Sequence, residues 1–82
     1  MKLVYFASLR ERIGKSAEDV DAPDSVHTVA DLVGWLSQRD EAYAATFESG
    51  VFRVAVDKKH VKPEASIAGA REIAFFPPMT GG

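Results

Sequence analysis

Residues 28–36 read Thr-Val-Ala-Asp-Leu-Val-Gly-Trp-Leu and lie near the middle of the chain. Four apolar side chains in this stretch follow the spacing i, i+3, i+4 and i+7: Val29, Leu32, Val33 and Leu36. Thr28 can accept a backbone N–H of the first helical turn, and Asp31 lies near the positive end of the helix dipole. The stretch therefore predicts an amphipathic helix whose apolar stripe packs against another element.

Segments of β type lie on both sides of this helix. Residues 2–7 are apolar and aromatic, and residues 16–21 are a weaker candidate that fits the return arm of a hairpin. Between them, residues 8–15 predict a turn or a single helical turn closed by a glycine. Residues 41–47 indicate a second short helix because they are rich in alanine. Three further strands are expected after it, at residues 51–56, 60–62 and 72–76.

The element order is therefore β-β-α-β-β-β, with the main helix in the middle. The first and last strands are the most apolar and suit the centre of a sheet. They are too far apart in the sequence for a hairpin, so as neighbours they would be parallel. A mixed sheet packed on one main helix is the β-grasp, or ubiquitin-like, arrangement of the α+β class. We expect residues 1–78 to form one β-grasp domain and residues 79–82 to form a flexible Gly-Gly tail.

Composition excludes several classes of function. The 82 residues include 10 basic and 12 acidic side chains, for a formal net charge of −2, so no concentrated basic surface is expected for nucleic acid or an anionic membrane. The chain has no cysteine, and its histidines, His27 and His60, are isolated, so no metal site is expected. No stretch approaches the roughly 20 apolar residues of a membrane span. These features predict a cytoplasmic protein.

The sequence also lacks the usual machinery of an enzyme. There is no thiol nucleophile, no Gly-x-Ser-x-Gly turn and no glycine-rich phosphate loop. A domain of this size rarely holds a water-excluding pocket by itself. We expect no bound cofactor, and any chemistry is expected inside a partner's site. Whether the chain counts as an enzyme stays open at this point.

The last six residues, 77–82, read Pro-Pro-Met-Thr-Gly-Gly. Two prolines cannot donate to a sheet ladder and favour an extended path away from the body. Two glycines without side chains let the backbone enter a channel too narrow for other residues. The terminal carboxylate is unreactive, but adenylation by ATP in a partner's site would make it an electrophile. A sulfur nucleophile would then give a thiocarboxylate, and an amine would give an amide.

Residues 75–82, Phe-Phe-Pro-Pro-Met-Thr-Gly-Gly, resemble the signature end of the MoaD family, the small subunits of molybdopterin synthase. Residues 3–11, Leu-Val-Tyr-Phe-Ala-Ser-Leu-Arg-Glu, resemble that family's first strand and the turn after it. The likeness extends over the whole chain in length and element order. Asp57 departs from the family, whose members often have Asn there, and Met79 replaces a smaller Val.

The resemblance implies a sulfur carrier of molybdenum cofactor biosynthesis. In that family an E1-like adenylyltransferase uses ATP to adenylate the terminal glycine, here Gly82, and a sulfur donor enzyme supplies the sulfur of the thiocarboxylate. The tail, with Gly81 clearing the way, enters the large synthase subunit in a two-plus-two heterotetramer. The sulfur passes to cyclic pyranopterin monophosphate and forms the molybdopterin dithiolene. The acid and base residues belong to the large subunit.

The alternation of the strands indicates where such a partner would dock. Phe76 and Phe6 are expected on the sheet face opposite the main helix, with Arg53 and His60 beside them. Arg10 matches an arginine that follows the family's first strand. The residues expected to bind the partner are Phe6, Arg10, Arg53, His60, Phe76, Pro77, Pro78, Met79 and Thr80.

Three alternatives share the fold. A thiamine-type sulfur carrier also ends in Gly-Gly but typically lacks the Phe-Phe-Pro-Pro sequence before it. A ubiquitin-like modifier would join Gly82 to lysines of other proteins. A plain binding module would use no terminal chemistry.

Overall fold

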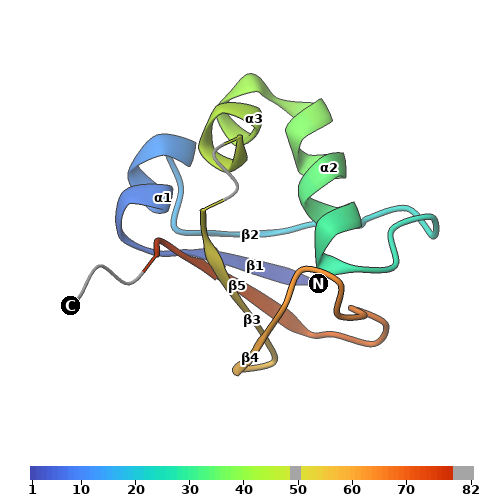
Figure 1. Ribbon diagram of the computed structural model, residues 1–82. Helices are drawn as coiled ribbons and strands as arrows, with labels where there is room; N and C mark the ends of the chain where they lie inside the picture. Colours follow the sequence, from blue (N-terminus) through green and yellow to red (C-terminus); the bar gives the residue numbers. More distant parts are fainter. Residues whose placement is uncertain (49–50, 79–82) are drawn as a thin grey trace.

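A computed structural model of the protein describes residues 1–48 and 51–78. The elements, in chain order, are β1 (Lys2–Tyr5), α1 (Ala7–Ile13), β2 (Ala17–Asp19), α2 (Val29–Arg39), α3 (Glu41–Phe47), β3 (Arg53–Val56), β4 (Lys59–Val61) and β5 (Glu72–Phe76). The strands form one mixed sheet in the order β2-β1-β5-β3-β4. All three helices lie on the same side of that sheet (Figure 1). The α+β class with a mixed sheet is confirmed.

The first and last strands lie side by side at the centre of the sheet. β1 and β5 are parallel, with Leu3 opposite Ile73 and Tyr5 opposite Phe75. β3 pairs with the other edge of β5 in the antiparallel sense. The parallel pairing expected from the two apolar strands is therefore confirmed, and β5 is the strand from which the C-terminal residues depart.

The core lies between the sheet and the helices. The sheet contributes side chains that are almost fully buried: Leu3, Tyr5, Val54, Ile73 and Phe75. The helix α2 contributes Val29, Leu32 and Leu36, while Val33 of the same stripe is only partly buried. The Phe75 ring meets the ring of Phe47 at 5.1 Å between centroids. Because Phe75 is buried on this side, the next residue, Phe76, must point to the opposite face of the sheet.

The main helix begins with the predicted cap. The backbone N–H of Asp31 donates to the Thr28 hydroxyl at 3.1 Å, and the Asp31 carboxylate accepts the N–H groups of His27 and Thr28. This reciprocal capping box satisfies donors that the first turn leaves unpaired. The N–H of His27, followed by that of Thr28, lowers the pKa of the Asp31 carboxyl.

Several expectations need correction. Residues 7–13 form a full helix, α1, rather than a turn or one helical turn, because Leu9 and Ile13 are both buried against the core. Gly14 closes this helix with φ 90°, as expected. Since Phe6 caps α1, β1 ends at Tyr5 and not at residue 7. The predicted order lacked α1, while the second short helix expected at residues 41–47 is confirmed as α3. Two of the later strands differ from the prediction only in their bounds: β3 begins at Arg53, and β4 spans Lys59–Val61.

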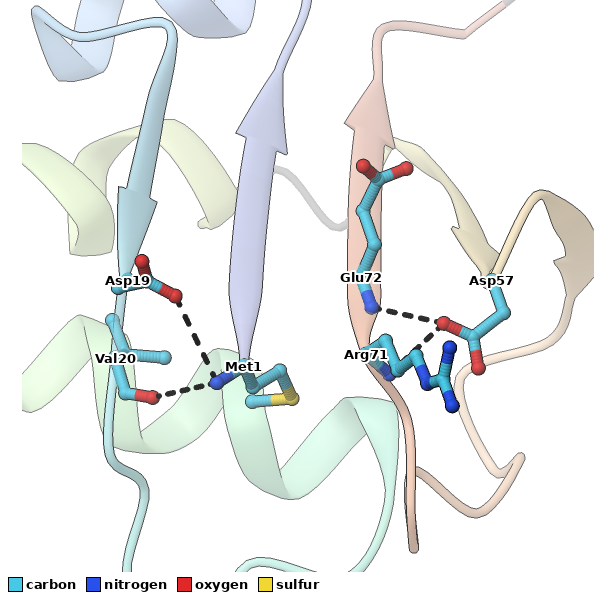
Figure 2. A network of polar contacts seen from close by, with 6 residues as sticks. All are labelled: Met1, Asp19, Val20, Asp57, Arg71 and Glu72. Carbon is cyan, nitrogen blue, oxygen red and sulfur yellow. Dashed lines mark hydrogen bonds and ion pairs between the residues drawn. The ribbon is translucent and has the colours of Figure 1, made fainter.

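Polar contacts hold the beginning of β1 against the end of β2, and the β3–β4 turn against the beginning of β5 (Figure 2). The amino group of Met1 donates to the Val20 carbonyl at 3.3 Å. On the other side, one carboxylate oxygen of Asp57 accepts the backbone N–H groups of Arg71 and Glu72, each at 2.9 Å. These bonds, that to Glu72 first, lower the pKa of the Asp57 carboxyl. The β3–β4 hairpin is thereby tied to the beginning of β5.

The half-buried carboxylate of Glu18 joins β2 to two further elements. Glu18 of β2 accepts hydrogen bonds from the hydroxyls of Tyr5, at 2.7 Å, and Tyr43. Lys15 lies 3.5 Å from its other oxygen. Burial alone would raise the pKa of Glu18, but the hydrogen bonds from Tyr43 and Tyr5 outweigh it and lower that pKa. Burial, with Glu18 as a partner, raises the pKa of both tyrosines. This network therefore secures α3 and β2 to the central strand β1.

Candidate functional site

The sheet face opposite the helices carries most of the residues predicted to bind a partner. Register fixes the side of each residue, because paired residues of neighbouring strands share a face. Arg53 is paired with Phe76, and Ala55 is paired with both Ala74 and His60. This face carries Val4, Arg53, Ala55, His60, Ala74 and Phe76, with Lys2, Ala17, Asp19 and Glu72 toward its other end, and Phe6 extends the row beyond β1.

The floor of this face is made of small side chains. Ala55 and Ala74 lie opposite each other on the central strands, and Val4 is the partner of Ala74 on β1. Their methyl groups are short, so the larger side chains in the next row project beyond them. The hollow of this face lies at the end of the sheet where β5 finishes, and it is lined by the larger side chains of Phe6, Arg53, His60 and Phe76.

A row of three rings borders that hollow. The rings of Phe6 and Phe76 are stacked, with centroids 4.6 Å apart and planes inclined by 3°. The His60 ring lies on Phe76 as well, at 5.6 Å. The backbone N–H of Phe6 donates to the Phe75 carbonyl at 3.1 Å and continues the β1–β5 pairing past the last residue of β1. The Phe76 ring thus contacts two rings from other parts of the chain, Phe6 after β1 and His60 of β4.

These residues line one groove of about 700 Å³: Phe6, Ala7, Arg53, His60, Phe76, Pro77 and Pro78. Its walls are largely apolar, and Phe6 remains 41% exposed. Ala7 has a positive φ of 51°, a backbone conformation that turns the chain sharply from the sheet into α1. The groove ends at the two prolines that precede the Gly-Gly terminus, so a protein that bound the terminus would also lie against the groove.

The structure brings together six of the predicted partner-binding residues, and their binding role stays a prediction. Arg10 lies on α1, is exposed, and does not line the groove. Met79, Thr80, Gly81 and Gly82 lie outside the described residues. Ala7 was missed by the sequence analysis, since a positive φ at a non-glycine residue has no signature in the sequence.

The groove is lined by aromatic, small and basic side chains and by two prolines. Among residues 1–48 and 51–78, no group of three or more His, Asp or Glu side chains could hold a metal ion. The titratable groups Tyr5, Glu18 and Tyr43 are hydrogen-bonded to one another next to the core and do not line the groove. In the same described residues, no helix is long and apolar enough to cross a bilayer.

The sequence model of the ThiS family matches residues 3–82, nearly the whole chain. The chain belongs to the ThiS family. Two curated relatives, from Haemophilus influenzae and Escherichia coli, are named molybdopterin synthase sulfur carrier subunit, and each is 33% identical over 82 residues, which cover 100% of this chain and 99% of the relative. The likeness to molybdopterin synthase small subunits, first indicated by the two ends of the chain, is confirmed at the level of the family.

This chain is also similar in structure to a protein modifier. The crystal structure of small archaeal modifier protein 1 from Haloferax volcanii superimposes with a TM-score of 0.72 at 27% identity. The match covers 96% of this chain and 97% of that one. The ubiquitin-like β-grasp fold is therefore confirmed for this member of the ThiS family.

Proposed function

We propose that this chain is the sulfur carrier subunit of a molybdopterin synthase, acting in the cytoplasm, with the transferable sulfur carried as a thiocarboxylate on Gly82. The observation that carries the proposal is the full-length likeness to relatives that bear this name. The Gly-Gly ending of the chain supplies the group that such a carrier needs. The absence of a cysteine means that no thiol of this chain competes for the sulfur.

The chemistry proceeds in three steps at the C-terminal carboxyl group of Gly82. In the site of an E1-like adenylyltransferase, the Gly82 carboxylate attacks the α-phosphate of ATP and pyrophosphate leaves. A sulfur donor enzyme then delivers sulfur at the oxidation level of sulfide (HS−), which attacks the acyl carbon, so that AMP leaves and a thiocarboxylate remains. In the large synthase subunit the sulfur passes to cyclic pyranopterin monophosphate, and two such transfers build the molybdopterin dithiolene. ATP is thus used by the activating enzyme, and this chain needs no bound cofactor.

The described part of the chain would provide the surface to which these partners bind. Residues 1–78 form the body that the large subunit covers at the groove, and residues 79–82 form the arm that enters its active site. Met79 and Thr80 would line the entry, and Gly81 would pass where a side chain could not. Arg10, exposed on α1, would pair with an acidic group of a partner. We expect a two-plus-two heterotetramer.

A second candidate function is modification of other proteins, in which the activated Gly82 is joined to lysine side chains. The observation that favours it is the structural likeness to small archaeal modifier protein 1. Both functions begin with the same adenylate and differ in the nucleophile that attacks it. A thiamine-type carrier would share the thiocarboxylate but would deliver its sulfur to a different acceptor.

The proposal is tested by reconstitution from purified components. The chain is combined with the E1-like enzyme, ATP, a sulfur donor, the large subunit and cyclic pyranopterin monophosphate, and the dithiolene product is measured by its oxidised fluorescent derivative. We expect product that depends on this chain and on ATP. Gly-Gly remnants on lysines of other proteins in cells, without dithiolene in the reconstituted system, would instead establish the modifier function.

A further inference from the structure

The groove combines apolar walls with two cationic or potentially cationic side chains. Arg53 is exposed and lies opposite Phe76 in the register of β3 and β5. His60, from β4, places its ring 5.6 Å from the same Phe76 ring. None of the groove's lining residues is acidic. The phenylalanine ring therefore has a basic side chain on each of the two strands beyond it.

These basic groups have no acidic partner within the described chain. For residues 1–48 and 51–78, the ion pairs are those of the Met1 amino group with Asp19 and of Lys15 with Glu18. Neither pair involves the groove. Arg53 and His60 are thus available for a group supplied from outside.

The β3–β4 hairpin adds positive charge beside the groove. Residues 53–62 contain one acid, Asp57, whose carboxylate is occupied by the backbone N–H groups of Arg71 and Glu72. The same stretch carries five basic or potentially basic residues: Arg53, Lys58, Lys59, His60 and Lys62. The chain as a whole is nevertheless acidic, with a formal net charge of −2. Positive charge is therefore concentrated at the hairpin that borders the groove.

We propose that the groove selects its partner through a carboxylate: an acidic side chain of the large synthase subunit lies between Arg53 and His60, while an adjacent apolar side chain packs on the Phe6–Phe76 ring pair. This inference rests on the proposed function and adds the chemistry by which the partner is recognised. The planar guanidinium of Arg53 suits a carboxylate because it can donate two parallel hydrogen bonds. The apolar walls exclude water from the contact and so strengthen the attraction.

The same arrangement would reject wrong partners. A large subunit with a neutral or basic side chain at this point would bury Arg53 without a counter-charge, and an unpaired buried charge is strongly unfavourable. The two phenylalanines would then supply contact area, and Arg53 with His60 would decide which large subunit is accepted.

The experiment titrates the chain with the large synthase subunit of the same organism by calorimetry, at low and at high sodium chloride. We expect Arg53→Glu to weaken binding by about a hundredfold, since close charge pairs across an interface are strongly coupled and reversal replaces attraction by repulsion. Arg53→Gln, which removes the charge without reversing it, is expected to lose about tenfold. The matched control is Arg12→Glu, the same charge reversal at an exposed position of α1 outside the groove, with less than about a twofold effect. Equal melting temperatures would show that the variants are folded.

The decisive experiment reverses the charge on both proteins, so that the two sides of the proposed ion pair exchange signs. An acid-to-lysine substitution at one position of the large subunit is expected to restore binding of Arg53→Glu while weakening binding of the wild type. If Arg53→Glu, Arg53→Gln and His60→Ala all bind as tightly as the wild type, while Phe76→Ala does not, recognition is apolar and this inference is wrong. Sulfur loading of Gly82 distinguishes failure of this inference from failure of the proposed function. A wild-type chain that neither loads sulfur nor binds the large subunit would overturn the proposed function itself.

Discussion

The aromatic rings of Phe6 and Phe76 lie parallel, with centroids 4.6 Å apart and planes inclined by 3°. Phe6 follows the first strand and Phe76 ends the last, so the contact exists because β1 and β5 pair in parallel. It stands where the chain leaves the sheet for Pro77. The stack therefore connects the folded body to the residues that precede the Gly-Gly terminus.

Neighbouring phenylalanines on β5 are expected to respond in opposite ways to truncation. Phe75 is fully buried, so Phe75→Ala should lower the free energy of unfolding by about 3–5 kcal/mol. Phe76 lies on the open face, so Phe76→Ala should cost much less stability and should weaken binding of the large subunit. Urea unfolding and calorimetric titration of both variants provide the measurements. A Phe76→Ala variant that is as unstable as Phe75→Ala would place Phe76 in the core and remove it from the docking surface.

Glu18 is expected to make stability depend on acid pH. Its pKa is lowered in the folded state, so its contribution is fully present above the pKa of the unfolded chain and is lost as pH falls through the lower folded value. Glu18→Gln should lower stability at neutral pH, since hydrogen bonds to a charged group contribute about 1.5–3 kcal/mol. The variant should also lose less stability than the wild type when the pH is lowered from neutral into the acid range. If the free energy of unfolding of Glu18→Gln fell with pH by the same amount as that of the wild type, this assignment would be contradicted.

Much of this architecture could be predicted from the sequence, because local patterns carry it. The stripe of α2 and the cap formed by Thr28 and Asp31 are properties of one segment. The alternation that sends Phe75 inward and Phe76 outward follows from the period of a strand. The parallel neighbours β1 and β5 followed from their apolar character and their distance along the chain.

Other features could not be predicted because their causes are not local. The helix α1 has only Leu9 and Ile13 as an apolar signal, and it forms because the core receives both side chains. The network of Tyr5, Glu18 and Tyr43 joins three elements, and nothing near Glu18 in the sequence announces two tyrosine partners. At the groove, the residues could be named, but the stacking of the rings depends on how three strands meet.

The two-residue turn between β3 and β4 contains an avoidable strain. Asp57 and Lys58 both have positive φ, 48° and 71°, as the favoured tight hairpin turn requires, and the second position normally holds glycine. Lys58→Gly should remove a conformational cost of roughly 1–2 kcal/mol, partly offset by the greater freedom of glycine in the unfolded chain. We expect a higher urea midpoint than that of the wild type. An equal or lower midpoint would show that Lys58 makes a contact worth more than the strain.

Gly81 is expected to matter for sulfur chemistry and not for folding. Gly81→Ile places a branched side chain beside the reacting carbonyl, where a small displacement of the reacting atom can cost about a hundredfold in rate. The melting temperature should be that of the wild type, while adenylation or sulfur transfer should fail. Gly81→Ala serves as the graded control and should retain part of the activity. Full activity of the isoleucine variant would mean that the terminus does not enter a narrow channel.

The central claim is that Gly82 is the sulfur carrier, and the intact mass of the chain tests it most directly. After incubation with the E1-like enzyme, ATP and a sulfur donor, the wild type should show one oxygen replaced by one sulfur at the C-terminus. Deletion of Gly82 moves the carboxylate back by up to about 3.5 Å, so this variant should melt like the wild type and gain no sulfur. A wild-type chain whose mass does not change, or a deletion variant that loads sulfur equally well, would contradict the account.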